Sequence, residues 1–184
     1  NDLFESINQG KCTVVTESIK SFNKNGILLE SGKELKADLV ISATGLKLKF
    51  MGGIKIKIDN KTIDPSKLVS YKGMMLQDIP NATVVFGYTN ASWTLKTDLV
   101  CEYFCRILNH MDKNELNSFV PKINDENLEI EPSIGLNSGY VKRAQKFLPK
   151  QGKKKTWKLN QNYINDIISF KFKKIEDEYI YFKK

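Results

Sequence analysis

The sequence predicts an α/β fold, in which a β-meander and buried strands precede one long helix. Residues 18–22 alternate polar and apolar side chains, as half-buried strands do. Residues 38–42 and 82–86 are short, continuous apolar runs, which are typical of strands covered on both faces of a sheet. Residues 99–111 carry apolar side chains at three- and four-residue spacing, which predicts an amphipathic helix.

The composition is that of a folded chain. The chain has 184 residues and a net charge of +8, with 41% hydrophobic and 27% charged residues, which is too apolar for a disordered chain. No run approaches the ~18 consecutive apolar residues of a membrane helix. Three cysteines without CxxC spacing and a single histidine predict neither a disulfide framework nor a metal site, and they favour a cytoplasmic location. Arg106 and Arg143 are the only arginines, and lysine reads bases and phosphates poorly, so nucleic-acid binding is disfavoured.

The N-terminal fifth of the chain predicts a meander and then a buried strand. Asn23–Gly26 has the residues of a tight hairpin turn, because Asn and Gly tolerate a positive φ. The buried strand at 38–42 ends in the small residues Ala43–Gly45, which let a backbone approach closely. The other predictions here are strands at 13–16, 18–22 and 26–30 and a turn at 31–33.

The rest of the chain predicts an edge strand, a second buried strand and the long helix. Ile54, Ile56 and Ile58 alternate with lysines, which is typical of an edge strand that is guarded against further pairing. The buried strand at 82–86 closes with Gly87, and the helix follows. The N-cap candidates of this helix are Asn90, Ser92 and Thr94. Beyond residue 112 we expect short helices at 115–120, 140–148 and 157–170, loops at 124–132 and 150–155, and an edge strand at 178–182.

The sequence contains no self-contained catalytic motif, since it lacks a GxSxG elbow, a P-loop, an HExxH motif and a GxGxxG turn. The informative feature is a pair of buried strands that end in small residues, the second followed by a helix. In α/β sheets, ligands collect beyond the carboxyl ends of such strands. A helix N-terminus there presents free amide groups and about half a positive charge, which suits a phosphate or an electron-rich ring that becomes anionic on reduction. For each pattern taken alone, a glycine needed only for the turn is the favoured interpretation.

Six segments share one resemblance. Ser42–Leu46 contains Ala-Thr-Gly, and Gly87–Lys96 (GYTNASWTLK) is the longest and most specific block. The others are Tyr71–Leu76, Ser138–Val141, Leu148–Gly152 and Trp157–Tyr163. Together these segments resemble flavin-dependent monooxygenases of the Baeyer–Villiger type, in particular their thioamide-activating branch. The resemblance covers nearly the whole chain.

The resemblance implies the C-terminal portion of a flavoprotein with two dinucleotide-binding, Rossmann-like domains. Residues 1–45 would be the closing part of the NADPH-binding domain. Residues 46–184 would be the C-terminal part of the FAD-binding domain, with a basic C-terminal extension. The upstream half of the same protein is then the expected partner of this chain.

The resemblance also implies two cofactors, FAD and NADPH, and a set of residues near them. The implied cofactor-binding residues are Thr44, Gly45, Asn90, Ala91 and Ser92. The last three would lie near the flavin ring, and the first two where the chain crosses between the domains. In the family, NADPH reduces FAD, and the reduced flavin reacts with O2 to give a C4a-peroxyflavin that oxygenates a ketone or a sulfur or nitrogen compound such as a thioamide or thioether.

The sequence departs from the family pattern in ways that leave the catalytic residues unassigned. The aromatic-glycine-histidine-tryptophan fingerprint and both glycine-rich nucleotide turns are missing, and neither Arg106 nor Arg143 matches the arginine that the family uses at the flavin. These features would belong upstream of Asn1. The first residue is not Met and no apolar signal segment follows it, so we expect a piece of a longer protein that is inactive by itself.

Two other interpretations rest on the lysines of residues 150–158. With Trp157 beside them, these lysines predict a basic, non-enzymatic module that grips nucleic acid or an acidic surface by stacking and phosphate contacts. The same lysines predict, at most, peripheral attachment to the inner face of the membrane, because one polybasic loop without a lipid chain gives weak anchoring.

Overall fold

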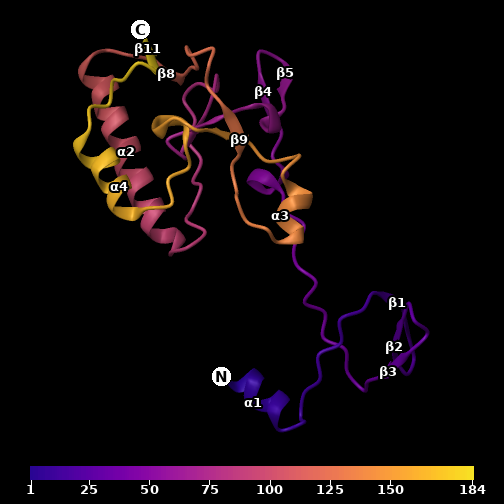
Figure 1. The fold of residues 1–184 in the computed structure, drawn as a ribbon. Helices are drawn as coiled ribbons and strands as arrows, with labels where there is room; N and C mark the ends of the chain where they lie inside the picture. The colour runs from indigo at the N-terminus through magenta and orange to yellow at the C-terminus, as the bar shows by residue number, and fades with distance from the viewer. The chain divides into compact units, whose positions relative to one another are not determined.

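The computed structural model describes residues 1–184, which form two units, Asn1–Thr44 and Gly45–Lys184 (Figure 1). The fold is α/β, as the sequence predicts, and consists of several small antiparallel sheets and one long helix. The assignment of the two units to NADPH-binding and FAD-binding domains stays a prediction.

The N-terminal unit is a short helix followed by a three-stranded meander in the order β1-β2-β3. Its elements are α1 (Asp2–Asn8), β1 (Ile19–Asn23), β2 (Gly26–Leu29) and β3 (Glu34–Lys36). The predicted hairpin is confirmed, since Asn23 pairs with Gly26 across a two-residue turn. The amide of Asn25 donates to the side-chain oxygen of Asn23 at 2.9 Å, which stabilises the turn locally.

Two strands predicted in this unit are wrong. Residues 13–16 and 38–42 lie outside every strand and form no backbone hydrogen bonds with other segments. Their apolar side chains are exposed, with Leu39 at 77% and Ile41 at 82% of the accessible surface. The physical reason is that a fully apolar strand needs hydrogen-bonded neighbours on its edges and cover on its faces, and the meander supplies neither.

The C-terminal unit contains one long helix, several short ones and four two-stranded antiparallel sheets. The sheets are β4 (Ile56–Ile58) with β5 (Lys61–Ile63), β6 (Ser70–Tyr71) with β7 (Met75–Leu76), β9 (Ile130–Pro132) with β10 (Lys150–Gly152), and β8 (Ser118–Pro121) with β11 (Ile180–Lys183). The helices are α2 (Trp93–Lys113), α3 (Gly139–Ala144) and α4 (Tyr163–Ile167), which continues as a π-helical turn at Ile168–Phe172. Single 3-10 turns lie at Phe50–Gly53, Pro65–Lys67 and Lys155–Trp157.

The predicted long helix, edge strands and basic helix are confirmed as elements. The helix predicted at 157–170 is confirmed only in part, since α4 begins at Tyr163. The loops predicted at 124–132 and 150–155 are wrong where they contain β9 and β10, because these two segments supply each other's strand hydrogen bonds. Two more predictions in this unit are wrong. Residues 115–120 are not a helix, because the chain turns at Glu115 and enters β8. Residues 82–86 form no strand, although the amide of Val84 donates to the carbonyl of Met74 at 2.7 Å. This segment is half-buried and is hydrogen-bonded along one edge only, so it lacks the second neighbour that a central strand requires.

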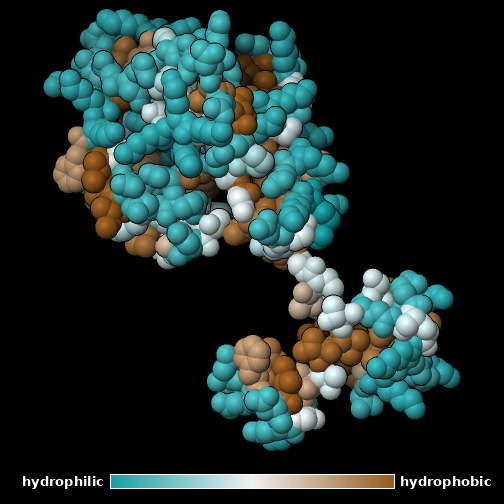
Figure 2. All heavy atoms as spheres, in the orientation of Figure 1, coloured by the Kyte–Doolittle hydropathy of each residue, from teal (hydrophilic) through white to brown (hydrophobic).

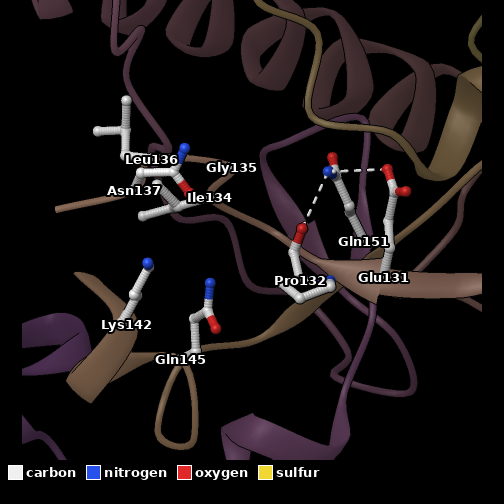
Figure 3. Close-up of a pocket in the computed structure, with 9 residues that line it drawn as sticks. All are labelled: Glu131, Pro132, Ile134, Gly135, Leu136, Asn137, Lys142, Gln145 and Gln151. Atoms are coloured by element: carbon white, nitrogen blue, oxygen red, sulfur yellow. Dashed lines mark hydrogen bonds between the residues drawn. The ribbon is translucent and has the colours of Figure 1, made fainter. Parts of the chain in front are cut away.

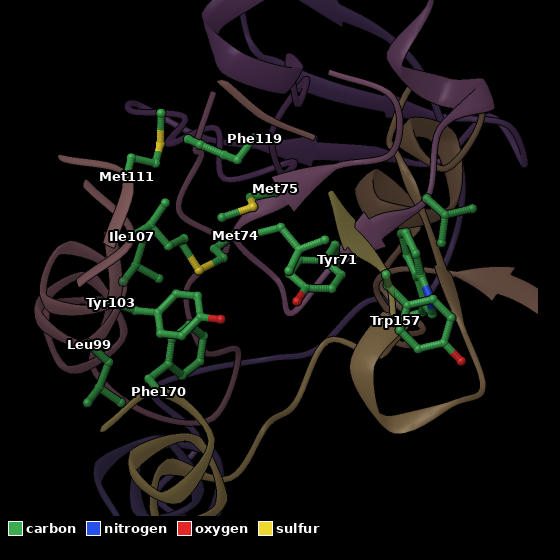
Figure 4. Close-up of a cluster of buried hydrophobic side chains, with 14 of the residues drawn as sticks. Tyr71, Met74, Met75, Leu99, Tyr103, Ile107, Met111, Phe119, Trp157 and Phe170 are labelled. Atoms are coloured by element: carbon green, nitrogen blue, oxygen red, sulfur yellow. The ribbon is translucent and has the colours of Figure 1, made fainter. Parts of the chain in front are cut away.

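The core of the C-terminal unit packs the apolar face of α2 against β6, β7 and β8 and the segment after α4 (Figure 4). Tyr103 of α2 meets Phe170 edge to face, with ring centroids 5.2 Å apart. Tyr71 of β6 meets Trp157 in the same manner at 5.4 Å. Such aromatic pairs add to the stability that burial supplies. The core therefore fixes where α2 begins relative to α4.

Apolar side chains also lie on the surface of both units, as the brown atoms in Figure 2 show. In the N-terminal unit they include Val14, Leu39 and Ile41, and in the C-terminal unit Trp93 and Phe172. No helix of the structure combines the length and the apolar character that crossing a membrane requires.

Candidate functional site

The start of α2 is exposed and has no side-chain cap. Ser92 is the N-cap residue, but its hydroxyl pairs with that of Thr94 at 2.7 Å instead of accepting a bond from a backbone amide. Asn90, Ala91 and Ser92 are all exposed. The first amides of this 21-residue helix therefore carry the partial positive charge of a helix N-terminus without a side chain of the chain's own to neutralise it.

Gly87 and Trp93 fix the shape of the turn into α2. The Trp93 indole lies against the backbone of Gly87, so that a Cβ added there would overlap the indole Cδ2 atom. Only glycine permits this close approach. Trp93 is nevertheless 60% exposed, and it stands next to the exposed residues at the start of the helix.

Gln161, just before α4, holds the middle of the same turn. Its side-chain oxygen accepts bonds from the amide of Thr89 at 2.8 Å and from the Thr89 hydroxyl at 3.0 Å. Its backbone carbonyl accepts a bond from the Asn90 side-chain amide at 3.1 Å. These contacts join segments that are about 70 residues apart in the sequence.

A buried ion pair lies one turn into α2. The Lys96 ammonium donates to Oδ2 of Asp166 at 2.6 Å, and the two side chains are 1% and 3% exposed. The Tyr88 hydroxyl donates to the same oxygen, also at 2.6 Å. Burial lowers the pKa of Lys96, against the opposite effect of Asp166, and burial together with the bond to Asp166 raises the pKa of Tyr88.

Sequence reasoning did not single out Lys96 or Asp166. One signal was available for Lys96, because it continues the apolar stripe of Leu99, Val100 and Tyr103 at three- and four-residue spacing. A lysine in that register is expected to be buried and to need an anionic partner. No local signal marks Asp166 as that partner.

Gly45 and Thr44, the other two predicted cofactor-binding residues, do not lie in the turn into α2. Gly45 has φ +93° and faces Tyr140 of α3, whose Cδ1 atom would be 3.5 Å from an added Cβ. Thr44 ends the N-terminal unit and is exposed. No hydrogen bond joins Gly45 to Asn90, Ala91 or Ser92. That these residues share one site stays a prediction.

A separate cavity of about 480 Å³ lies beside α3 (Figure 3). Lys142 of α3 and Gln145, which directly follows α3, extend toward the loop of Ile134–Asn137. On the other side, the Gln151 side chain donates to the carbonyl of Pro132 and to the carboxylate of Glu131, both at 3.1 Å. None of the predicted cofactor-binding residues lines this cavity.

The stacking contact predicted for Trp157 is wrong. Trp157 is fully buried in the core, where it packs between Tyr71 and Tyr179, so that it cannot stack on a base. Lys153 and Lys154 form ion pairs with Glu129 and Asp125. The structure thus does not favour a basic module that binds nucleic acid through this loop.

Comparison with known proteins gives one consistent result. The chain is 48% identical over 183 residues to the FAD-containing monooxygenase EthA of Mycobacterium tuberculosis and 43% identical to EthA of Mycolicibacterium smegmatis. It is also 43% identical over 184 residues to AlmA of Acinetobacter baylyi, which is named for FAD binding. Each alignment covers all of this chain but 37% of the relative, so the chain spans little more than a third of their length. No family model and no solved structure matches the chain.

Proposed function

Since the chain is homologous over its whole length to the C-terminal part of FAD-containing monooxygenases, we propose that it is the C-terminal segment of such an enzyme. The complete enzyme uses FAD, NADPH and O2 to oxygenate a ketone or a sulfur or nitrogen compound such as a thioamide or thioether. The names of the relatives mention only FAD and the monooxygenase activity. We add to the proposal the use of NADPH, the class of substrate and a cytoplasmic location.

The exposed, uncapped start of α2 is the structural observation that supports this proposal. An isoalloxazine gains negative charge on reduction, and free helix-terminal amides with a partial positive charge suit such a ring. Asn90, Ala91 and Ser92 are exposed and leave this end of the helix accessible to a ligand. The residues present therefore fit a flavin, and in this proposal Asn90, Ala91 and Ser92 would hold its ring.

When bound, FAD supplies the hydride acceptance and the activation of O2 that no amino-acid side chain provides. The chain's own contribution is to bind and orient. Asn90 is held by Gln161, so the amides of Ala91 and Ser92 keep a fixed direction. Thr44 and Gly45 lie at the boundary of the two units, and a passage between two cofactor domains at this point agrees with the small side chains there.

The unpaired apolar segments support the proposal that the chain is completed by preceding polypeptide. Residues 13–16, which are β-branched, and the apolar residues 38–42 are exposed and without backbone partners, and 82–86 are bonded along one edge. Strands of a parallel sheet show this composition when both neighbours are in place. In this proposal they are strands of two Rossmann-like domains, one binding NADPH and one binding FAD, whose neighbours belong to the upstream half of the same protein.

The test is to produce the chain together with the coding sequence that precedes Asn1. We expect a yellow protein that contains FAD and oxidises NADPH with matching O2 uptake when a ketone, thioether or thioamide is added. The chain of 184 residues by itself is expected to show no such activity, because it lacks the glycine-rich nucleotide turns.

A longer protein that purifies without colour and stays inactive with added FAD would contradict the proposal. Binding of NADH in place of NADPH would contradict the choice of nucleotide alone.

A further inference from the structure

The buried cluster of Lys96, Asp166 and Tyr88 touches no proposed ligand, yet it lies directly beneath the exposed turn into α2. Tyr88 precedes the turn and Lys96 follows it, so the two flank Asn90–Ser92 in the sequence. Both donate to one oxygen of one carboxylate, that of Asp166 in α4. A single side chain from a distant element therefore ties the two ends of the turn together.

We propose that Asp166 and Lys96 are positioning residues, which hold the amides of Asn90–Ser92 in the place where the flavin ring is bound. This inference rests on the proposed function. It goes further because it assigns a role in flavin binding to two residues that do not contact the ring.

Stability alone gives no reason for the ion pair. Removing two charges from water costs free energy, and well-packed apolar side chains of similar volume usually serve at least as well. The Lys96 ammonium has one carboxylate partner and otherwise faces rings, with the Phe170 centroid at 4.7 Å and that of Tyr88 at 5.4 Å. An ion pair differs from apolar packing in its directionality, because it fixes which atoms meet.

The bonds to Asp166 and Gln161 hold the turn into α2 in one position. Asp166 holds the two flanks of the turn, and Gln161, five residues earlier, holds its middle through Thr89 and Asn90. Asn162 caps α4 by accepting a bond from the amide of Asn165 at 3.0 Å, which anchors the segment that carries both. The start of α2 is thus clamped at three points by one short segment, while its outer face stays free.

The chain contains a matched control for this cluster. Lys72, Asp177 and Tyr71 repeat the same chemistry, with Lys72 3.2 Å from Asp177 and the Tyr71 hydroxyl donating to the same carboxylate oxygen at 2.7 Å. The side chains of this second cluster form no hydrogen bond with residues 87–92. Its removal should disturb the core without moving the start of α2.

The experiment compares two double variants of the full-length, FAD-loaded protein, Lys96→Met with Asp166→Leu and Lys72→Met with Asp177→Leu. Both remove a lysine–aspartate pair without leaving a charge buried. We expect the first to fold but to bind FAD about tenfold more weakly and to have a more negative flavin reduction potential, because displaced amides stabilise the reduced ring less. We expect the second to keep the FAD affinity and potential of the wild type.

Equal FAD affinity and potential in the first variant and the wild type would overturn the inference, because the pair would then be replaceable packing. If the first variant does not fold, Tyr88→Phe removes only one bond to Asp166, and it should still weaken FAD binding severalfold. An unchanged FAD affinity in Tyr88→Phe would also overturn the inference. A wild-type protein that binds no FAD is a different result, which overturns the proposed function and the inference together.

Discussion

Tyr71 and Tyr88 are buried tyrosines whose hydroxyls both donate to carboxylates. Tyr71 donates to Asp177 at 2.7 Å and Tyr88 to Asp166 at 2.6 Å. Burial is the main cause that raises the pKa of each phenol, and for Tyr88 the bond to Asp166 adds to it. Ionisation would place a phenolate next to a carboxylate inside the protein, so each residue stays neutral as long as the chain is folded.

We expect alkaline pH to destabilise the chain through these two residues. Since the folded-state pKa is raised, the folded chain holds protons that the unfolded chain releases above pH ~10, and the free energy of unfolding falls from there upward. Urea denaturation from pH 7 to 11 measures this decline. Tyr88→Phe should reduce the slope and cost about 2 kcal/mol at pH 7, through the lost bond to a carboxylate.

Phenolate absorbance supplies the check on this prediction. If Tyr71 and Tyr88 both ionise near pH ~10 while the chain is still folded, their environment is not the buried one described. Tyr140→Phe is the matched control, because Tyr140 is half-buried and its hydroxyl makes no hydrogen bond.

At the scale of the element, α2 has two roles: its apolar face anchors it in the core, and its N-terminal end is open to a ligand. Its apolar stripe, with Leu99, Tyr103 and Ile107 fully buried, anchors the helix in the core. Its first turn is left open, with Ser92 as an N-cap that does not cap. A helix whose middle is rigid and whose start is free suits the binding of an electron-rich ligand at that end.

Ser92→Asp separates a structural role of this end from a ligand-binding one. Aspartate is a good N-cap and its charge favours the helix dipole, so the stability of the chain should stay equal or rise by up to about 1 kcal/mol. In the full-length protein the same charge should repel the reduced flavin, lower the reduction potential and weaken FAD binding severalfold. Asn109→Asp, on an exposed position near the other end of α2, adds the same charge as a control.

Thermal unfolding and flavin potentiometry measure the two effects. If Ser92→Asp and Asn109→Asp give the same flavin reduction potential, the start of α2 does not face the flavin.

At the scale of the whole molecule, the two units differ in how much core they contain. In Gly45–Lys184, aromatic and aliphatic side chains from α2, β6, β7, β8 and β11 and from the segments around Trp157 and Phe170 meet in one cluster. In Asn1–Thr44, Leu29 is the buried hydrophobic residue, and the apolar residues of 38–42 are exposed. Below ~40–50 residues, a unit with so little core does not usually fold by itself.

We therefore expect the C-terminal unit, produced without residues 1–44, to fold by itself and the N-terminal unit to depend on further polypeptide. The isolated C-terminal unit should unfold cooperatively in urea and keep the emission of a buried Trp157, which is fully covered in the structure. Residues 1–44 alone should show the spectrum of a largely unfolded chain. A non-cooperative C-terminal unit, or a cooperatively folded N-terminal one, would contradict this division.

The sequence by itself determined the features whose hydrogen bonds are local. The helix at Trp93–Lys113 and the hairpin at Asn23–Gly26 follow from bonds between residues a few positions apart, so periodicity and turn residues suffice to predict them. The exposed residues Asn90–Ser92 were likewise singled out from the sequence, through a family resemblance.

Only the tertiary structure decided the features whose partners are far away in the chain. The strands predicted at 38–42 and 82–86 did not form, because a strand exists only where other segments supply its hydrogen bonds. The pairing of Lys96 with Asp166, 70 residues further on, was equally out of reach of any local pattern. A buried charge reveals in the sequence that it needs a partner, but the packing of α2 against α4 selects which residue that partner is.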